Sequence, residues 1–284
     1  MKKQIVHSLA VAVFLIGAGA WGAEGEEAFL LPGDRRGNAL WTARLAEAEA
    51  LLEAAEGGTP ARTLVETAPL EKHVPAVPMT ADVTGLDYVW LLSKDGGDGT
   101  GGDHTTWVDP VITCNDGTTA SAMDLPIVAS DAGWREITVA RAGHKSDWMR
   151  RREHYQIASC IYTNGWWNHP DGAFCLKLGG KVKTLSVWVG AEKDSSESGK
   201  IAFAISSAVP RKRLVKMLGK NLRDEFPEMD RLLARDLGAK WYGHAAFFKL
   251  PQAKRRAHLA RYGRADAVAR LQAQAAAEEL EKAV

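Results

Sequence analysis

The chain has 284 residues, with 36 Lys and Arg against 35 Asp and Glu, which gives a formal net charge of +1. This balance excludes a global electrostatic attraction to nucleic acid or to anionic membranes. A chain of this length can bury a sizeable core and is long enough for one domain with extensions.

The N-terminus has the pattern of a secretory signal. Two lysines precede an apolar run over residues 9–16, and several small residues follow it. Because this run is too short to span a membrane comfortably, we expect cleavage after Ala20 or Gly22 and export to the periplasm or the medium. The prediction is a signal peptide over residues 1–22 and a mature protein without a membrane span, and an uncleaved N-terminal anchor is the alternative.

Residues 23–81 are predicted to contain one helix and a linker. The segment 41–56 is rich in Ala, Leu and Glu and ends at two glycines, which is typical of a single surface helix. Four prolines without clear periodicity follow between residues 57 and 81, and they indicate a linker that lies against the next domain.

Residues 82–208 are predicted to form eight short strands, each bounded by Gly, Asp, Asn or Pro. The expected strands are 86–93, 107–114, 122–129, 134–140, 155–162, 173–178, 183–190 and 200–207. Alternation in the last three predicts a shared core face, made of Phe174, Leu176, Leu178, Leu185, Val187, Val189, Ile201, Phe203 and Ile205. Strands of this number and spacing indicate an all-β sandwich of the jelly-roll type.

The loop after the first predicted strand concentrates glycine and negative charge. Residues 95–109 read DGGDGTGGDHTTWVD. Such charge density is costly unless a cation or a set of backbone amides lies against it. We expect a structural Ca²⁺ ion held by turn carbonyls and by four carboxylates, those of Asp95, Asp98, Asp103 and Asp109. The alternative is that these carboxylates accept hydrogen bonds from turn amides.

The order of motifs in this region resembles the NPCBM group of carbohydrate-binding modules, which includes the family-51 modules of secreted glycoside hydrolases. The motifs are an apolar strand at 89–92, the acidic loop, DHTTWVDP at 103–110, Gly133-Trp134, His169 and LSVWVG at 185–190. The resemblance covers roughly residues 82–208. It implies a galactose-binding-like jelly roll that binds sugars through loops at one end of the sandwich.

Aromatic and amide side chains in the predicted loops are candidates for glycan binding, because a sugar site needs a flat aromatic with Asn, Asp or His at its edge. Residues 165–170 supply that combination after an Asn-Gly turn. The family has small residues, Gly-x-Gly-Thr, at the positions before its His, so this chain departs from the pattern there. Single tryptophans on strands, such as Trp90 and Trp188, are expected in the core. The predicted carbohydrate-binding residues are Trp134, Trp148, Trp166, Trp167, Asn168 and His169.

Three cysteines lie in the strand-rich region, at positions 114, 160 and 175. In an oxidising compartment one pair could form a disulfide, and Cys160 with Cys175 across neighbouring strands fits best, although the sequence leaves the pairing open.

Residues 209–284 are predicted to form a basic helical extension. They contain 17 Lys and Arg against 9 Asp and Glu, a net charge of +8. An amphipathic stripe indicates a first helix, and a second is expected over 265–282 after a helix-breaking patch at 243–251. The stripe consists of Leu222, Phe226, Met229, Leu233 and Leu237.

Two functions are compatible with these features. The first is an exported carbohydrate-binding module for a glycan or cell-surface polysaccharide. The second is a structural or interaction protein with a degenerate sugar site, which docks on a protein partner or an anionic envelope polymer through residues 209–284. Carboxylates in matched acid and base roles and the G-x-S-x-G and H-E-x-x-H motifs are absent from the sequence, so we expect no catalysis. Specific nucleic-acid binding is not expected.

Overall fold

A computed structural model describes residues 35–57, 61–134, 136–141, 150–264, 268, 270–274 and 276–277. The predicted signal peptide, Trp148 and most of the helix expected over 265–282 lie outside the described residues. Within these ranges, helices account for the start and the end of the chain and strands for its middle.

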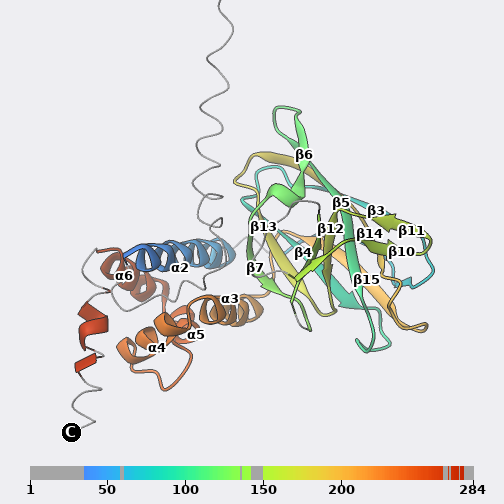
Figure 1. Ribbon diagram of the computed structural model, residues 1–284. Helices are drawn as coiled ribbons and strands as arrows, with labels where there is room; N and C mark the ends of the chain where they lie inside the picture. The colour runs from blue at the N-terminus through green and yellow to red at the C-terminus, as the bar shows by residue number, and fades with distance from the viewer. Residues whose placement is uncertain are drawn as a thin grey trace, which may run out of the picture.

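The described strands form two packed sheets and a separate hairpin (Figure 1). Their bounds are β1 Thr63–Glu66, β2 Leu70–Glu71, β3 Val77–Asp82, β4 Tyr88–Asp95, β5 Thr105–Cys114, β6 Thr119–Ser121, β7 Ile127–Asp131, β8 Thr138–Ala140, β9 Arg150–Arg152, β10 Tyr155–Ile157, β11 Cys160–Tyr162, β12 Gly165–Asn168, β13 Ala173–Lys177, β14 Val182–Ala191 and β15 Lys200–Ser206. One sheet has the order β1-β15-β4-β13-β7, with β2 paired to β15. The other has the order β3-β14-β5-β12-β8-β9, with β6 paired to β5. Described pairs are antiparallel except β8 with β9, so the predicted β-sandwich is confirmed.

Period-two alternation explains the core between the sheets. All nine positions predicted from the last three strands are buried there, because successive side chains of a strand point to opposite faces. Trp107 lies at the centre, edge-on to Phe174 and Phe203 at ring-centroid distances of 6.0 and 5.0 Å. The same alternation turns Trp188 outward between two buried valines, and it is 45% exposed rather than in the core. Trp90 is buried as expected.

Three strands lie in the segment where a linker was expected, between residues 57 and 81. β1 pairs with β15, β2 also pairs with β15, and β3 pairs with β14. β3 contains Pro78 and lies at the edge of its sheet, where a residue without an N–H donor removes no ladder hydrogen bond. Pro78 is therefore compatible with an edge strand, and its presence did not place this segment outside the sheets.

Two other predicted strands differ in detail. The segment 155–162 is a tight hairpin of β10 and β11, whose turn contains Ala158 at φ 49°. The segment 122–129 begins with a 3₁₀ turn over Ala122–Asp124 before β7 starts. The hairpin covers part of the outer face of the seven-stranded sheet, where Tyr155 and Ile157 pack against Trp167.

The three cysteines are all free, so the disulfide expected between Cys160 and Cys175 is wrong. Cys160 is exposed on the hairpin strand β11, whereas Cys175 is buried on β13 of the six-stranded sheet. Sequence spacing suggested neighbouring strands, but the two strands belong to different sheets. Burial raises the pKa of the Cys175 thiol well above its usual value, which makes it an inert core residue.

Helices from both ends of the chain form one layer beside the six-stranded sheet (Figure 1). They are α2 Arg35–Glu56, α3 Arg211–Glu225, α4 Pro227–Asp236, α5 Gly243–Lys249 and α6 Gln252–Tyr262. A second core joins Trp41 and Leu45 of α2 to the C-terminal helices and to Trp90 and Ala129 of the sheet. The N-terminal helix thus packs one face against this layer and leaves the other face, with Ala43, Ala46 and Ala50, exposed.

The helical extension has more breaks than the hydrophobic stripe predicts. The stripe is split between α3 and α4, where Pro227 occupies the first position of the second helix, as proline favours. The segment 243–251 was expected to break helices, but it contains α5. Phe247 and Phe248 of this short helix are completely buried, and their packing stabilises it. Gly243 is needed there, since a Cβ on it would lie 2.2 Å from the Asp230 carbonyl oxygen.

Buried polar groups in the helical layer are paired. Arg255 is fully buried and donates to both oxygens of Glu49, at 2.8 and 2.6 Å, and to Glu56 at 2.6 Å. His244 is also buried, with Nδ1 2.7 Å from Asp230 and Nε2 accepting from Trp41 Nε1 at 2.8 Å. No helix in the described part of the chain is both long enough and apolar enough to cross a lipid bilayer.

Candidate functional site

Four loops meet at one end of the sandwich and are hydrogen-bonded to one another. They are residues 96–104 between β4 and β5, 132–134 and 136–137 between β7 and β8, 169–172 between β12 and β13, and 192–199 between β14 and β15. His169 N donates to Ala132 O at 2.8 Å, and Asp95 N donates to Asp171 Oδ1 at 3.1 Å. Ser196 N donates to Gly102 O at 2.8 Å. These contacts bring together residues that are up to about 100 positions apart in the sequence.

The segment 165–168, predicted as a sugar-binding loop, is the buried strand β12. It lies between β5 and β8 inside the seven-stranded sheet. Gly165 permits this pairing, since a Cβ on it would lie 2.3 Å from the Trp107 carbonyl oxygen. Trp166 points into the inter-sheet core and Trp167 points to the other face, and they are 2% and 6% exposed. Neither indole presents a face to solvent.

Asn168 is also buried, and its side chain connects three strands. Its Oδ1 accepts from Thr105 Oγ1 at 2.5 Å and from Trp107 Nε1 at 3.1 Å, while its Nδ2 donates to Ser93 Oγ at 2.7 Å. Hydrogen bonds of this kind offset the cost of burying an amide. Asn168 therefore has a structural role here.

A row of aromatic rings leads from the solvent into this end of the sandwich. Trp134 is 49% exposed, and its ring lies 5.8 Å from the His169 ring. His169 lies 6.1 Å from His104, which lies 5.4 Å from Trp167. His104 was not predicted as a site residue, although its position after the acidic loop and before β5 was a signal for it.

Glycine determines how closely Trp134 approaches His169. Gly133 has φ +74°, and a Cβ on it would lie 2.3 Å from the His169 carbonyl oxygen. A side chain at this position would separate the two loops, so the Gly-Trp motif has a steric reason. Arg213 of α3 supports the loop of residues 169–172 by donating to the Asp171 carbonyl oxygen at 2.6 Å. Among the predicted sugar-binding residues that the structure describes, Trp134 and His169 are thus the pair that meets at the surface.

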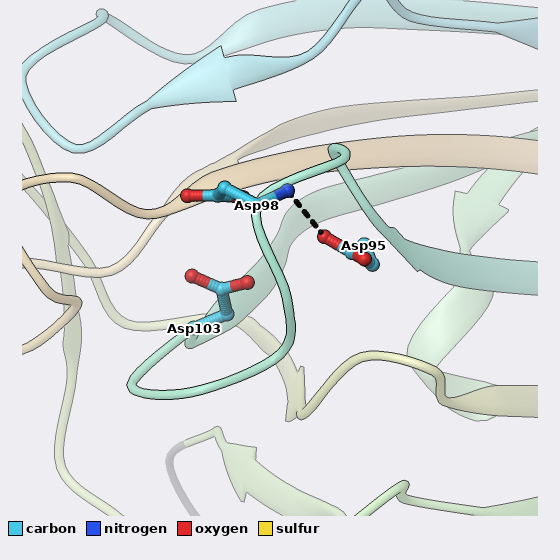
Figure 2. A group of neighbouring side chains, drawn as sticks. All are labelled: Asp95, Asp98 and Asp103. Atoms are coloured by element: carbon cyan, nitrogen blue, oxygen red, sulfur yellow. Dashed lines mark hydrogen bonds between the residues drawn. The ribbon is translucent and has the colours of Figure 1, made fainter.

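The acidic loop brings together three of its four aspartates. Carboxylate oxygens of Asp95, Asp98 and Asp103 all lie within 4.8 Å of one another (Figure 2). Asp109 is not part of this group, because it is an exposed residue of β5, at φ 48°, with its N–H bonded to Asn164 O at 2.8 Å. Its inclusion in the predicted metal site is not supported by this geometry.

The three aspartates have different surroundings. Asp95 Oδ1 accepts from the N–H groups of Gly97, Asp98 and Gly99 at 2.8, 3.2 and 3.0 Å, as expected of a turn-capping carboxylate. Asp98 Oδ1 accepts from Lys200 N at 3.3 Å. Both oxygens of Asp103 are buried and have no hydrogen-bond partner. Burial, with the nearby charges of Asp98 and Asp95, raises the pKa of Asp103 to about 6.

The turn between β14 and β15 lies against the acidic loop and buries two polar residues there, Glu192 and Ser195. Ser195 is 3% exposed, and its Oγ accepts from His104 N at 3.0 Å and donates to His104 O at 3.1 Å. Glu192 is also buried, and burial raises its pKa. This turn therefore holds His104 in position.

Comparison with known proteins gave one match. Residues 56–113 match the model of the NPCBM/NEW2 domain, a segment that runs from the end of α2 through the acidic loop to the end of β5. Searches of curated proteins and of solved structures found no match. The NPCBM domain indicates a carbohydrate-binding module, a class that is generally non-catalytic. Residues 56–113 are thus similar to the NPCBM/NEW2 domain, and the β-sandwich of the chain is consistent with that similarity.

Proposed function

We propose that this protein is an exported, non-catalytic carbohydrate-binding module that holds a glycan at Trp134 and His169. The observation that supports this most directly is the exposed face of Trp134 beside the His169 ring, at the end of the sandwich where four loops meet. Solvent-exposed tryptophans with an ordered polar neighbour are typical of sites that stack on a ligand.

The chemistry of the pair fits a sugar ring. The apolar C–H face of a sugar can stack on the indole of Trp134, and its hydroxyls need polar partners at the edge of that face. His169 Nδ1 lies 2.5 Å from the Pro170 carbonyl oxygen. Because a carbonyl oxygen only accepts, Nδ1 holds the proton and the neutral ring offers Nε2 as an acceptor for a sugar hydroxyl.

In the described part of the four loops, Trp134 is the one exposed tryptophan, which favours a small recognition unit. One indole face covers about one sugar ring, so the proposed ligand is a terminal or branching residue of a glycan rather than a long run of polymer. Trp166, Trp167 and Asn168 then act as the scaffold beneath the site. Their buried positions on β12 hold the loop that begins at His169.

Binding to a glycan array tests the proposal, with a tryptophan of matched exposure as the control. Trp134→Ala and His169→Ala should each weaken binding at least about tenfold, which corresponds to about 1.4 kcal/mol. Trp188 is 45% exposed against 49% for Trp134 and lies on the outer face of β14, so Trp188→Ala should bind as the native protein does. Loss of binding with Trp188→Ala but not with Trp134→Ala would place the sugar elsewhere.

Export is part of the proposal and has its own test. The lysine-flanked apolar run and the small residues after it support a cleaved signal. Mass spectrometry of the protein recovered from outside the bacterial cytoplasm should give a mature N-terminus at residue 21 or 23. A full-length chain that stays in the cytoplasm would contradict this part of the proposal.

A second candidate function has one observation in its favour. Lys212, Lys216 and Lys220 are exposed on α3 at intervals of four residues, which places them on one face of the helix. Elsewhere in the extension, basic residues such as Arg255, Arg256 and Arg261 pair with carboxylates. If the protein docks on an anionic polymer, replacing the three lysines by alanine should abolish salt-sensitive retention on a sulfated-polysaccharide column. Retention unchanged by the replacement would exclude this surface.

A further inference from the structure

The connection between α4 and α5 exposes two adjacent aromatic side chains. Trp241 is 69% exposed and Tyr242 is 59% exposed, so both are more exposed than Trp134 at the proposed sugar site. Large apolar side chains that gather on the surface of a protein mark sites of interaction. Figure 1 shows α4 farther from the strands than α3. The two rings therefore belong to a surface of the helical layer.

The backbone holds this pair of rings in a fixed position. Tyr242 has φ 59° and ψ 63°, a left-handed conformation that bulky residues rarely adopt. Gly243 then packs so closely on α4 that a Cβ on it would lie 2.2 Å from the Asp230 carbonyl oxygen. His244 follows, completely buried, and its backbone N–H donates to Asp230 Oδ1 at 2.8 Å. The exposed rings are thus attached directly to a rigid part of the core.

Strain at Tyr242 indicates that its side chain serves more than the turn. Glycine and asparagine adopt a left-handed backbone more easily than tyrosine does. The Tyr242 ring lies under Arg223, whose guanidinium carbon is 5.5 Å from the ring centroid. Because both side chains remain partly exposed, this cation–π contact is weak. Strained residues cluster at functional sites, and a binding surface accounts for an exposed tyrosine here.

A row of basic residues on α3 leads to the two rings. Lys212, Lys216 and Lys220 are exposed at intervals of four residues, and Arg223 follows three residues later. This spacing places all four side chains on one face of the helix, and the opposite face is buried in the helical core. Since Arg223 also contacts Tyr242, the basic face continues to the exposed rings.

Positive charge on this surface is left without carboxylate partners. The three lysines of α3 and the exposed Lys240, next to Trp241, occur in none of the described salt bridges. All five acidic side chains of α3 and α4 are already paired with an arginine or a histidine. The pairs are Arg223–Asp224, Arg44–Glu225, Arg231–Glu228, His244–Asp230 and Arg261–Asp236. The surface is therefore locally cationic, although the whole chain has a net charge of only +1.

Exposed aromatic rings beside unpaired lysines fit the surface of an anionic lipid bilayer. Tryptophan and tyrosine are enriched where a membrane meets water, because the ring enters the headgroup region while its N–H or O–H stays hydrated. Each lysine near an anionic bilayer strengthens binding roughly fivefold. A polymer held by charge would use the lysines but not the rings, and a sugar stacked on the rings would not need a row of lysines.

We propose that Trp241 and Tyr242 enter the headgroup region of an anionic lipid bilayer and that the lysine face of α3 lies against the same bilayer. The protein then binds a membrane peripherally through its helical layer. The lysine face is shared with the second candidate function, whereas the two rings distinguish a bilayer from a polymer. Membrane binding does not rest on the proposed glycan site, which lies on the sandwich.

Co-sedimentation with lipid vesicles tests the proposal. The protein is purified as it is exported, and all variants share its N-terminus, so residues 9–16 do not affect the comparison. Vesicles of phosphatidylcholine and phosphatidylglycerol at about 2:1 should bind the native protein, and phosphatidylcholine alone should bind it at least about tenfold more weakly. Trp241→Ala and Tyr242→Asn should each weaken binding to the anionic vesicles at least about fivefold.

Two features of these variants keep the comparison matched. Asparagine tolerates the left-handed backbone at position 242, so Tyr242→Asn removes the ring without adding strain. Trp188→Ala is the control for loss of an exposed tryptophan, because Trp188 is 45% exposed but lies on the outer face of β14. This control should bind the vesicles as the native protein does.

Fluorescence quenching measures whether the rings enter the bilayer. Lipids brominated near the headgroup end of their acyl chains should quench part of the tryptophan emission of the bound native protein. Trp241→Ala, at a lipid concentration that binds it, should lose this quenching, while Trp188→Ala should retain it. A native protein that binds without quenching would be held by charge alone, which would overturn the proposal.

Three further results would overturn it: no binding of the native protein to the anionic vesicles, equal binding by the Trp241→Ala/Tyr242→Asn double variant, or binding unchanged when the three lysines are replaced by alanine. Lysine-dependent retention on the sulfated polysaccharide without vesicle binding would assign the surface to a polymer instead. Thermal unfolding checks that each variant is folded. If Tyr242→Asn is not, Trp241→Ala decides alone, because its side chain is the more exposed of the two.

Exchanging the tests separates this proposal from the glycan site. Trp134→Ala should bind vesicles normally, and Trp241→Ala should bind glycan normally. Vesicle binding without glycan binding would contradict the proposed function and support the membrane surface. Glycan binding without vesicle binding would contradict the membrane surface alone.

Discussion

The helical layer and the loop end of the sandwich differ in whether their buried polar groups have hydrogen-bond partners. In the helical layer, Arg255 is paired with two glutamates, and His244 is hydrogen-bonded on both ring nitrogens. At the loop end, Asp103 and the Trp167 indole N–H are buried without partners, and Trp134 is left in solvent. In the helical layer, these buried polar groups have hydrogen-bond partners within the protein. Buried polar groups without such partners, gathered at one set of loops, indicate a place where a ligand can supply the missing interactions. Stability and binding are therefore expected to depend on different residues.

The largest effect is expected from the buried arginine of the helical layer. Arg255→Ala leaves Glu49 buried without its cation and should lower the free energy of unfolding by about 3–5 kcal/mol, as measured by urea denaturation. Arg256 is the matched control, because its pair with Glu53 is exposed, and Arg256→Ala should cost at most about 1 kcal/mol. Equal losses in the two variants would show that burial of the ion pair does not decide its contribution.

The buried Asp230–His244 pair should make the helical layer acid-sensitive. Burial alone would raise the pKa of Asp230, but the hydrogen bonds from the His244 ring and backbone outweigh it and lower the pKa below its ordinary 3.8. The stability from this group is present above pH 3.8 and is lost as pH falls through the lowered pKa. Asp230→Asn should remove this part of the acid sensitivity, about 1.5–3 kcal/mol for charge-assisted hydrogen bonds. Parallel stability curves of the two proteins below pH 4 would contradict this account.

A comparison of Gly133 at the loop end with Gly117 in the turn between β5 and β6 separates the cost of backbone strain from the cost of a steric clash. Gly133 and Gly117 have φ values of +74° and +84°, but a Cβ would collide with the His169 carbonyl oxygen at Gly133 and meet nothing within 4 Å at Gly117. Both alanine variants should lose about 1 kcal/mol from the left-handed backbone. Gly133→Ala should lose at least about 1 kcal/mol more, together with glycan binding, while Gly117→Ala keeps it. Identical thermal unfolding of the two variants would show that the loops are not tightly joined.

The smallest stability effect is expected at the proposed sugar site itself. Trp134 is half exposed, so Trp134→Ala should change the free energy of unfolding by no more than about 0.5 kcal/mol. Its effect should appear in glycan binding and not in denaturation. A loss of several kcal/mol would instead make Trp134 a structural residue and would weaken the comparison between the two regions.

The core positions of the last three strands and the acidic turn could be predicted because they depend on local sequence patterns. The nine alternating core positions in the last three strands were predicted correctly, since a period of two places them on one face. The acidic loop could be recognised because glycine and aspartate are turn residues with a clear local effect. β3 and α5 were missed for a shared reason, because proline and glycine usually interrupt regular structure. In the fold, Pro78 lies on an edge strand, and Gly243 lies where α5 closely approaches α4, so neither residue prevents the element.

The sequence alone determined the sandwich core, the NPCBM resemblance and the crowding of aspartates after β4, because each depends on the type and spacing of nearby residues. Only the tertiary structure decided that Trp166 and Trp167 are buried, that Asp109 leaves the acidic group, and that Trp134, His169 and His104 form one row. Exposure and proximity depend on which strands become neighbours. That pairing is set by packing between segments that are far apart in the sequence, such as Thr63 of β1 and Ser206 of β15, and no local pattern contains it.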